Sequence, residues 1–371
     1  MTDEAPLYVT QPSLPPLDEF LPYLEDIWRS KWLTNGGKFH SAFEAELCRF
    51  LGVEHLSLLS NGTLALIVAL QSLRITGEVI TTPYSFVATT HALHWNGIKP
   101  VFVDIDPDTF ALDPALIESA ITPQTTAILP THVYGYPANI AQIQRIADTY
   151  GLRVIYDAAH AFSVETDGTS ILAHGDASIL SFHAAKVFST IEGGAVICPD
   201  AKLKKRIDYL KNFGFADEVT VVAPGINAKM NELQAAFGLA QIKHYDEAIA
   251  VRRQVDALYR EQLADIRGLR VPALPQTSRA NYSYFCVFVE PTFPFSRDAL
   301  FERFRAKNIL VRRYFYPLIS DFPMYRGLPS ADPAHLPVAR RIADSVLCLP
   351  IHSQMSTEDA ERVVDVIRSV R

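Results

Sequence analysis

The sequence predicts an α/β protein built around a mostly parallel β-sheet. Short runs rich in β-branched residues alternate with stretches of helical periodicity, an order typical of a parallel sheet with crossover helices. Several runs are apolar throughout, as strands buried on both faces of a sheet should be. The chain has 371 residues, more than one small core organises. We therefore expect a large α/β domain over residues 1–250 and a smaller α+β domain over residues 251–371.

Seven short runs in the first two hundred residues are expected to form the sheet. Each has a length that is usual for a strand. The predicted strands are His55–Leu59, Glu78–Thr82, Pro100–Ile105, Thr126–Thr131, Leu152–Asp157, Ala177–Phe182 and Gly194–Cys198.

Helical periodicity fills most of the intervals between these strands. The predicted helices are Thr63–Leu73, Phe86–Asn96, Pro114–Ala120, Ile140–Tyr150 and Ala201–Asn212. A longer helical pattern then runs from about Met230 into the 260s with few helix breakers, and we expect one helix there that bridges the two domains.

The remaining third of the chain predicts the smaller domain. Prolines 272 and 275 interrupt the helical pattern, and a strand-like aromatic run follows at Tyr282–Val289. Helices are predicted over Arg297–Lys307 and Thr357–Val370.

The bulk composition excludes several classes of protein. The net charge is −7, which argues against nucleic acid or an anionic membrane as the main partner. No apolar run approaches the length of a membrane span, and the acidic start Met1-Thr2-Asp3-Glu4 lacks the apolar core of a signal peptide. The four cysteines form no C-x-x-C pair, which disfavours a disulfide scaffold and fits a reducing cytoplasm.

Polar residues follow several of the predicted strands. Asp157 ends one strand and precedes His160, and Ser181 ends the next strand, shortly before Lys186. The dipeptide Gly62-Thr63 joins the first strand to its helix. Because open α/β sheets bind ligands at the carboxyl ends of their strands, we expect these residues to meet at one edge.

Pyridoxal phosphate chemistry needs this set of groups. A lysine that forms a Schiff base must lose its proton, and burial lowers the pKa of an amine. A carboxylate opposite the pyridine nitrogen keeps that nitrogen protonated, so that the ring can accept electrons. A helix N-terminus with nearby hydroxyl groups suits a phosphate.

Each of these residues also has a purely structural interpretation. Lys186 alone could be a surface residue, Asp157 a helix cap, and His160 a hydrogen-bonded core histidine. A metal site is the main rival, because His174, His183 and Asp176 lie nearby in the sequence. No H-E-x-x-H or comparable ligand spacing occurs, however, and we therefore expect no metal.

A series of short motifs runs in order along nearly the whole chain. They are Ser60-Asn61-Gly62-Thr63, Pro83-Tyr84-Ser85-Phe86-Val87-Ala88-Thr89, Val101-Phe102-Val103-Asp104, His132-Val133-Tyr134-Gly135, Asp157-Ala158-Ala159-His160, Ser181-Phe182-His183 with Lys186, Glu192-Gly193-Gly194, Asn231-Glu232-Leu233-Gln234-Ala235-Ala236 and Leu349-Pro350-Ile351-His352. In these motifs the chain resembles the sugar aminotransferases of the DegT/DnrJ/EryC1/StrS family. The resemblance implies the type I, aspartate-aminotransferase-like fold of pyridoxal-phosphate enzymes.

The resemblance implies catalytic roles for three residues. Lys186 would form the Schiff base with pyridoxal phosphate, and Asp157 would face the pyridine nitrogen. His160 would pack on one face of the ring, with Phe86 near it. The presence of Lys186 favours transamination, because dehydrating relatives carry histidine at that position.

The resemblance also implies how the cofactor phosphate is held. Gly62, Thr63 and Ser181 would bind it from one subunit, and Asn227 would reach it from the neighbouring subunit of a homodimer. Two residues after that asparagine the family often has arginine, whereas this chain has Lys229. Lysine offers a point charge rather than a planar fork, so we assign no role to Lys229.

The substrate implied by the resemblance is a keto-sugar attached to a nucleoside diphosphate, with L-glutamate as amino donor. Residues 32–37 and 209–215 look most like a subgroup that converts dTDP-4-keto-6-deoxy-D-glucose to dTDP-4-amino-4,6-dideoxy-D-glucose for surface polysaccharides. Candidate cations for the diphosphate are Arg312, Arg313 and Lys211. The alternatives are a C3-specific or other nucleotide-sugar aminotransferase of the same fold, and a non-catalytic sensor of pyridoxal phosphate or a sugar nucleotide. The Asp157 and Lys186 pair argues against the sensor.

Overall fold

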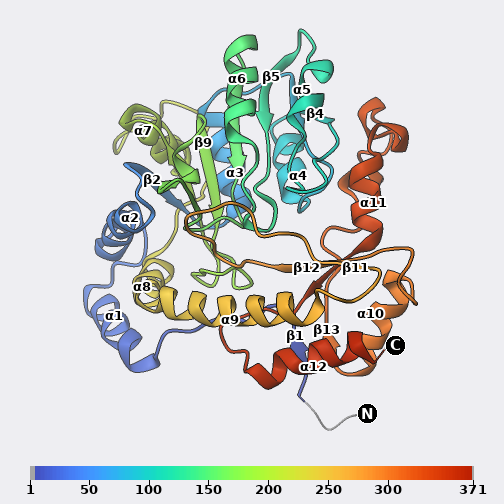
Figure 1. Cartoon of the computed structure of the whole chain (residues 1–371). Helices are drawn as coiled ribbons and strands as arrows, with labels where there is room; N and C mark the ends of the chain where they lie inside the picture. The colour runs from blue at the N-terminus through green and yellow to red at the C-terminus, as the bar shows by residue number, and fades with distance from the viewer. Residues whose placement is uncertain (1–4, 370–371) are drawn as a thin grey trace.

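The computed structural model describes residues 5–369 and is organised around a seven-stranded sheet (Figure 1). The strand order is β2-β10-β9-β6-β5-β3-β4, and β10 alone runs antiparallel to its two neighbours within this sheet. The strands are β2 (His55–Leu59), β3 (Glu78–Thr81), β4 (Lys99–Phe102), β5 (Thr125–Leu129), β6 (Arg153–Asp157), β9 (Ala177–Ser181) and β10 (Gly194–Cys198). The predicted mostly parallel, seven-stranded sheet is confirmed.

Helices cover both faces of the sheet, which explains why its strands are apolar throughout. On one face, α3 (Gly62–Ser72), α4 (Ala88–Trp95) and α7 (Ala201–Leu210) enclose one apolar core. On the other face lie α2 (Lys38–Leu51), α5 (Pro114–Ile117), α6 (Ile140–Tyr150) and α8 (Glu232–Gln241). The alternation is visible in β5, where Ile128 packs on the α6 side and Leu129 on the α3 side.

The prediction of a single long helix from Met230 is wrong. The chain forms α8, a 3-10 turn at Ile242–His244 and then α9 (Tyr245–Leu263), which lies beneath the sheet in Figure 1. No proline or glycine marks the break. The two helices have different packing partners: α8 lies so close to α2 that a Cβ on Gly238 would come within 2.4 Å of the Phe43 ring, whereas α9 packs on the C-terminal helix.

The C-terminal segment forms a second core. An antiparallel sheet of β11 (Leu269–Arg270), β12 (Phe285–Val289) and β14 (Val346–Leu349) packs with α10 (Arg297–Ala306) and α12 (Thr357–Arg368). Of these, β12, α10 and α12 lie close to predicted elements. Val370, at the predicted end of the last helix, lies outside the described residues. Strand β1 (Leu7–Tyr8) pairs with β13 (Ile309–Leu310), and residue 250 falls within α9. The division into domains at that residue stays a prediction.

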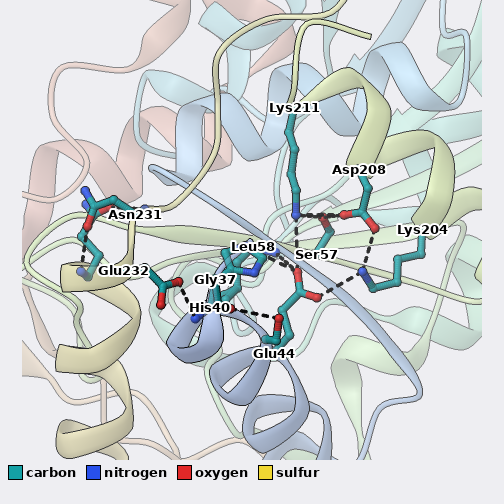
Figure 2. A network of polar contacts seen from close by, with 12 residues as sticks. Gly37, His40, Glu44, Ser57, Leu58, Lys204, Asp208, Lys211, Asn231 and Glu232 are labelled. Carbon is teal, nitrogen blue, oxygen red and sulfur yellow. Dashed lines mark hydrogen bonds and ion pairs between the residues drawn. The ribbon is translucent and has the colours of Figure 1, made fainter. Parts of the chain in front are cut away.

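Several elements were not anticipated. Helix α2 has glycine at its N-cap and receives its cap from α8: the carboxylate of Glu232 accepts hydrogen bonds from the main-chain N–H groups of Phe39 (2.8 Å) and His40 (2.9 Å) (Figure 2). Other unanticipated elements include β1, β11, α1 (Leu17–Ser30), α11 (Pro337–Ser345), β7 (Glu165–Thr166), β8 (Thr169–Ser170) and short 3-10 turns at Val133–Gly135, Ile171–Ala173, Ile319–Asp321, Pro329–Ala331 and Pro333–His335. Within residues 5–369, no helix combines the length and apolarity needed to cross a membrane.

Candidate active site

A cavity of about 750 Å³ lies at the carboxyl-terminal edge of the large sheet. It is bounded by the N-terminus of α3 and by the loops that follow β3, β6 and β9. Seven of the eight predicted site residues line it: Gly62, Thr63, Phe86, Asp157, His160, Ser181 and Lys186. The structure thus brings together residues that are up to 124 positions apart in the chain (186 − 62).

Lys186 projects from the loop between β9 and β10. Its main-chain N–H donates to the oxygen of His183 (2.8 Å), which fixes the start of the turn. Part of the residue remains exposed, but its amino group lies deep in the protein. This burial lowers the pKa of the amine to about 8, although the nearby Asp157 acts in the opposite direction. Near neutral pH, the side chain is therefore a neutral, nucleophilic amine in a larger fraction of molecules than an ordinary lysine would be.

Asp157 ends β6 and is almost completely buried. Its Oδ2 accepts a hydrogen bond from the Thr89 hydroxyl (2.6 Å) and its Oδ1 accepts one from the Ala159 main chain (3.1 Å). Burial raises the pKa of this carboxyl group, while Thr89, Ala159 and Lys186 oppose the shift. Among the described residues, Asp157 has no salt-bridge partner within 4 Å. Its charge therefore remains available to a cationic ligand in the cavity.

His160 is held in one orientation at the side of the cavity. Its Nδ1 accepts a hydrogen bond from the main-chain N–H of Tyr134 (3.2 Å), and its ring is nearly parallel to that of Phe315, with centroids 5.8 Å apart. Burial, together with the charge of Lys186, holds the pKa of His160 well below its usual value. The ring is therefore neutral with its proton on Nε2, a flat surface suited to stacking.

The N-terminus of α3 forms an anion cradle. Asn61 caps the helix by accepting from the main-chain N–H of Leu64 (2.8 Å), while the N–H groups of Gly62 and Thr63 lie in the first turn, where a helix offers no acceptor. A Cβ on Gly62 would lie 2.8 Å from the Cβ of Ser181, so glycine is needed to bring Ser181 against this turn. These groups suit a phosphate, and the whole residue set therefore fits pyridoxal phosphate.

Several lining residues escaped the sequence analysis. Tyr284, Tyr314 and Phe315 come from the C-terminal segment and close one side of the cavity. The main-chain oxygen of Tyr314 accepts hydrogen bonds from the buried hydroxyl groups of Tyr84 and Tyr134. These residues follow no strand of the large sheet. Their local signals are two aromatic runs, Tyr282–Val289 for Tyr284 and Tyr314 to Tyr316 for the other two.

Other predicted residues lie elsewhere. Asn227 does not line the cavity of its own chain. It is exposed at the base of a hairpin, where it pairs with Asn212 and its Oδ1 accepts from Lys229 Nζ (3.0 Å). Lys229 also donates to Asn212 (2.8 Å). None of the three candidate diphosphate cations lines the cavity either. Lys211 is instead buried in an ionic cluster, defined here as Glu44, Ser57, Lys204, Asp208 and Lys211 (Figure 2).

The residues named for the rival metal site lie apart in the structure, and of His174, Asp176 and His183 only His183 lines the cavity. Among residues 5–369, no three His, Cys, Asp or Glu side chains are grouped so that they could hold a metal ion. His174 and Asp176 do not line the cavity; His174 lines a separate surface depression beside α6, and Asp176 pairs with Arg153.

The chain matches the model of the DegT/DnrJ/EryC1/StrS aminotransferase family over residues 17–368. A relative from Escherichia coli, named dTDP-4-amino-4,6-dideoxy-D-glucose transaminase, is 54% identical over 360 residues, which are 97% of each chain. The crystal structure of DesI in the presence of its TDP-sugar product superposes with a TM-score of 0.94 at 38% identity, covering 99% of this chain and 93% of that one. A Bacillus subtilis structure, ntda with bound cofactor PMP, gives 0.87 at 28% identity and covers 95% and 81%.

These similarities, together with the site, define a pyridoxal-phosphate aminotransferase of the type I fold. The chain belongs to the DegT/DnrJ/EryC1/StrS aminotransferase family.

Proposed function

We propose that the protein transfers an amino group from L-glutamate to C4 of dTDP-4-keto-6-deoxy-D-glucose, forming dTDP-4-amino-4,6-dideoxy-D-glucose for surface polysaccharides. The observation that supports the proposed transaminase activity is that Lys186, Asp157 and His160 line the same cavity. The choice of sugar is supported by the name of the relative that is 54% identical over nearly the whole chain. Cytoplasmic location is supported by four cysteines that form no disulfide.

When bound, pyridoxal phosphate supplies an electron sink for the carbon that gains the amino group. Residues of the chain transfer the proton, orient the ring and limit access of water. Lys186 Nζ, neutral in a useful fraction of molecules, accepts and returns a proton beside that carbon. Asp157, oriented by Thr89, would hold a proton on the ring nitrogen of the cofactor, and His160, oriented by the Tyr134 main chain, would present its flat face to the ring. Tyr314 and Phe315 reduce access of water from the C-terminal side.

We also propose that two chains form a symmetric dimer with shared active sites. The hairpin before Asn227 exposes apolar side chains that a monomer would leave in water: Phe213, Phe215, Val219, Val221, Val222 and Ile226. Helix α1 and the residues after it add further exposed apolar side chains: Leu17, Leu21, Trp28, Trp32 and Leu33. Exposed apolar surface of this extent is typical of an interface. An Asn227 that projects from such an interface can reach a phosphate in the partner.

The test is product analysis with the purified enzyme. Incubation with dTDP-4-keto-6-deoxy-D-glucose, L-glutamate and pyridoxal phosphate should give a product with nitrogen at C4, as shown by NMR. Lys186→Ala should abolish turnover without loss of fold, whereas Lys202→Ala, an exposed lysine on α7, should not change it. Nitrogen at C3 would establish the alternative regiochemistry. Full activity of Lys186→Ala would refute the proposed mechanism.

A further inference from the structure

The buried position of Asp157 disfavours the ionised form that the proposed chemistry requires. The residue is 4% exposed, and burial favours the neutral, protonated form of its carboxyl group. The proposed chemistry needs the opposite, because only the ionised carboxylate can hold a proton on the ring nitrogen of the cofactor. An arginine would be the usual source of compensation, but the groups that favour the ionised form of Asp157 are the Thr89 hydroxyl, the Ala159 main chain and the charge of Lys186.

Three buried hydroxyl groups lead away from this carboxylate in a line. Thr89 Oγ1 lies 2.6 Å from Asp157 Oδ2, Ser85 Oγ lies 2.7 Å from Thr89 Oγ1, and Thr131 Oγ1 lies 3.3 Å from Ser85 Oγ. All three are at most 4% exposed. They come from separate parts of the fold: Thr89 from the first turn of α4, Ser85 from the loop before it, and Thr131 from the loop after β5.

The direction of every proton in this line follows from the ionised carboxylate. A carboxylate can only accept, so the Thr89 hydroxyl must donate to it. The single proton of Thr89 is then used, and Thr89 must accept from Ser85. Ser85 must in turn accept from Thr131. All three O–H dipoles therefore point toward Asp157, and hydrogen bonds arranged head to tail in this way strengthen one another.

We propose that Thr131, Ser85 and Thr89 form a positioning chain that keeps Asp157 ionised and aims its carboxylate at the ring nitrogen of the cofactor. The inference rests on the proposed function and adds three residues to it. Thr89 acts directly on Asp157, whereas Ser85 and Thr131 act through Thr89. The effect of removing a hydroxyl group should therefore fall in the order Thr89, Ser85, Thr131.

The protein provides a matched control residue next to Thr89. Thr90 occupies the next position of α4 and is equally buried, but its hydroxyl group has no hydrogen-bond partner in the described part of the protein. Thr89→Val and Thr90→Val make the same isosteric change in the same helix turn, and only the first removes a hydrogen bond to Asp157. Thr89→Ser keeps a hydroxyl group at this position and should keep Asp157 ionised as in the wild type.

The decisive measurement is the protonation of the ring nitrogen, read from the ¹⁵N chemical shift of labelled pyridoxal phosphate bound to the intact enzyme over a range of pH. Thr89→Val should lose this proton at lower pH than the wild type, while Thr90→Val and Thr89→Ser should follow the wild type. Turnover of Thr89→Val should fall about tenfold, as expected for loss of one hydrogen bond to a charged group, with KM for the sugar nucleotide unchanged.

The outcomes separate this inference from the proposed function. If Thr89→Val keeps the nitrogen protonated over the same pH range as the wild type, or if Thr90→Val shifts it equally, the positioning chain is wrong. A wild-type protein that binds no pyridoxal phosphate would overturn both proposals. Because the nitrogen signal is read without sugar, a different amino-sugar product would overturn only the proposed substrate.

Discussion

Asn281 donates a hydrogen bond from Nδ2 to the main-chain oxygen of His160 over 2.8 Å. The same amide donates to the oxygen of Phe162 (3.1 Å), and its Oδ1 accepts from the main-chain N–H of Ser283 (3.2 Å). Asn281 is 2% exposed and belongs to the segment after α9, so the C-terminal part of the chain holds the turn that carries His160.

Substitution of Asn281 should therefore affect both stability and cofactor binding. Asn281→Ala leaves the buried main-chain oxygen of His160 without a donor, while the oxygen of Phe162 keeps the hydroxyl group of Tyr245 (3.3 Å). The substitution should lower the free energy of unfolding by about 1–3 kcal/mol. Asn281→Asp should cost more, because a carboxylate would face the two oxygens. Urea denaturation and titration with pyridoxal phosphate measure the two effects. A variant of wild-type stability would show that the amide is dispensable.

The lowered pKa of Lys186 predicts how cofactor capture depends on pH. Below about pH 8 the amine is protonated and cannot attack the cofactor aldehyde, so the rate of capture should rise through that pH and then level off. Stopped-flow absorbance after mixing apoprotein with pyridoxal phosphate measures this rate. Asp157 favours the protonated amine, so Asp157→Asn should move the midpoint to lower pH. A midpoint near the ordinary value of a lysine would contradict the role of burial.

Asp157→Asn should reduce turnover far more than it reduces cofactor binding. Asparagine cannot hold a proton on the ring nitrogen, and we expect a loss of about a hundredfold or more, larger than one neutral hydrogen bond would give. Asp113→Asn is the matched control, because Asp113 is a true helix cap that accepts from the main-chain N–H of Ala115 (2.9 Å). Similar, small effects of the two substitutions would reduce Asp157 to a cap.

Subunit complementation tests the shared sites. Chains inactivated by Lys186→Ala would be mixed, after dissociation, with chains inactivated by Asn227→Glu, which places an acidic group against the phosphate. If Asn227 acts in trans, one site of each hybrid dimer carries both defects and the other carries neither. Activity should then return to about a quarter of the wild-type value with random pairing.

The same mixture gives the contrary result if Asn227 serves its own chain. Each hybrid site would then carry one defect, and activity would stay at the level of the parent variants. A fully active monomer in sedimentation experiments would exclude sharing altogether.

The ionic cluster of Figure 2 predicts a contrast between two lysines. Lys211 and Lys204 contact the same carboxylates, Glu44 and Asp208, but their side chains are 8% and 26% exposed. Burial alone would raise the pKa of Asp208, and the two lysines together with Ser57 lower it instead. Lys211→Met should lower the free energy of unfolding by about 3 kcal/mol, and Lys204→Met by about 1 kcal/mol. Equal losses would show that burial does not set the effect.

The sheet and most of the cavity could be predicted from sequence because their signals are local. Buried parallel strands appear as continuous apolar runs, and the residue at the end of each run, such as Asp157 or Ser181, lies at the ligand-binding edge. The order of the strands, with β10 antiparallel, has no such signal. Neither does the approach of Tyr314 and Phe315, which depends on how a distant segment packs against the edge.

The wrong and missing predictions also concern features that depend on contacts between residues far apart in the sequence. The break between α8 and α9 follows from packing on different partners rather than from a proline or glycine. The cap of α2 comes from Glu232, almost two hundred residues away, so the usual cap residue is absent from the sequence before Lys38. The role of Lys211 was also hidden, because a lysine that neutralises buried carboxylates looks like any other lysine in the sequence.

The antiparallel return of β10 constrains how this protein can vary through evolution. Since β9 and β10 are adjacent and antiparallel, the segment that carries Lys186 leaves and re-enters the sheet at the same edge, and it is pinned by hydrogen bonds between Phe182 and Gly193 and between Ala184 and Ile191. A crossover connection can absorb added residues in its helix, but this closed turn cannot do so without displacing the amine. Insertions and deletions between residues 182 and 193 should therefore be purged by selection, even at positions where substitutions are tolerated.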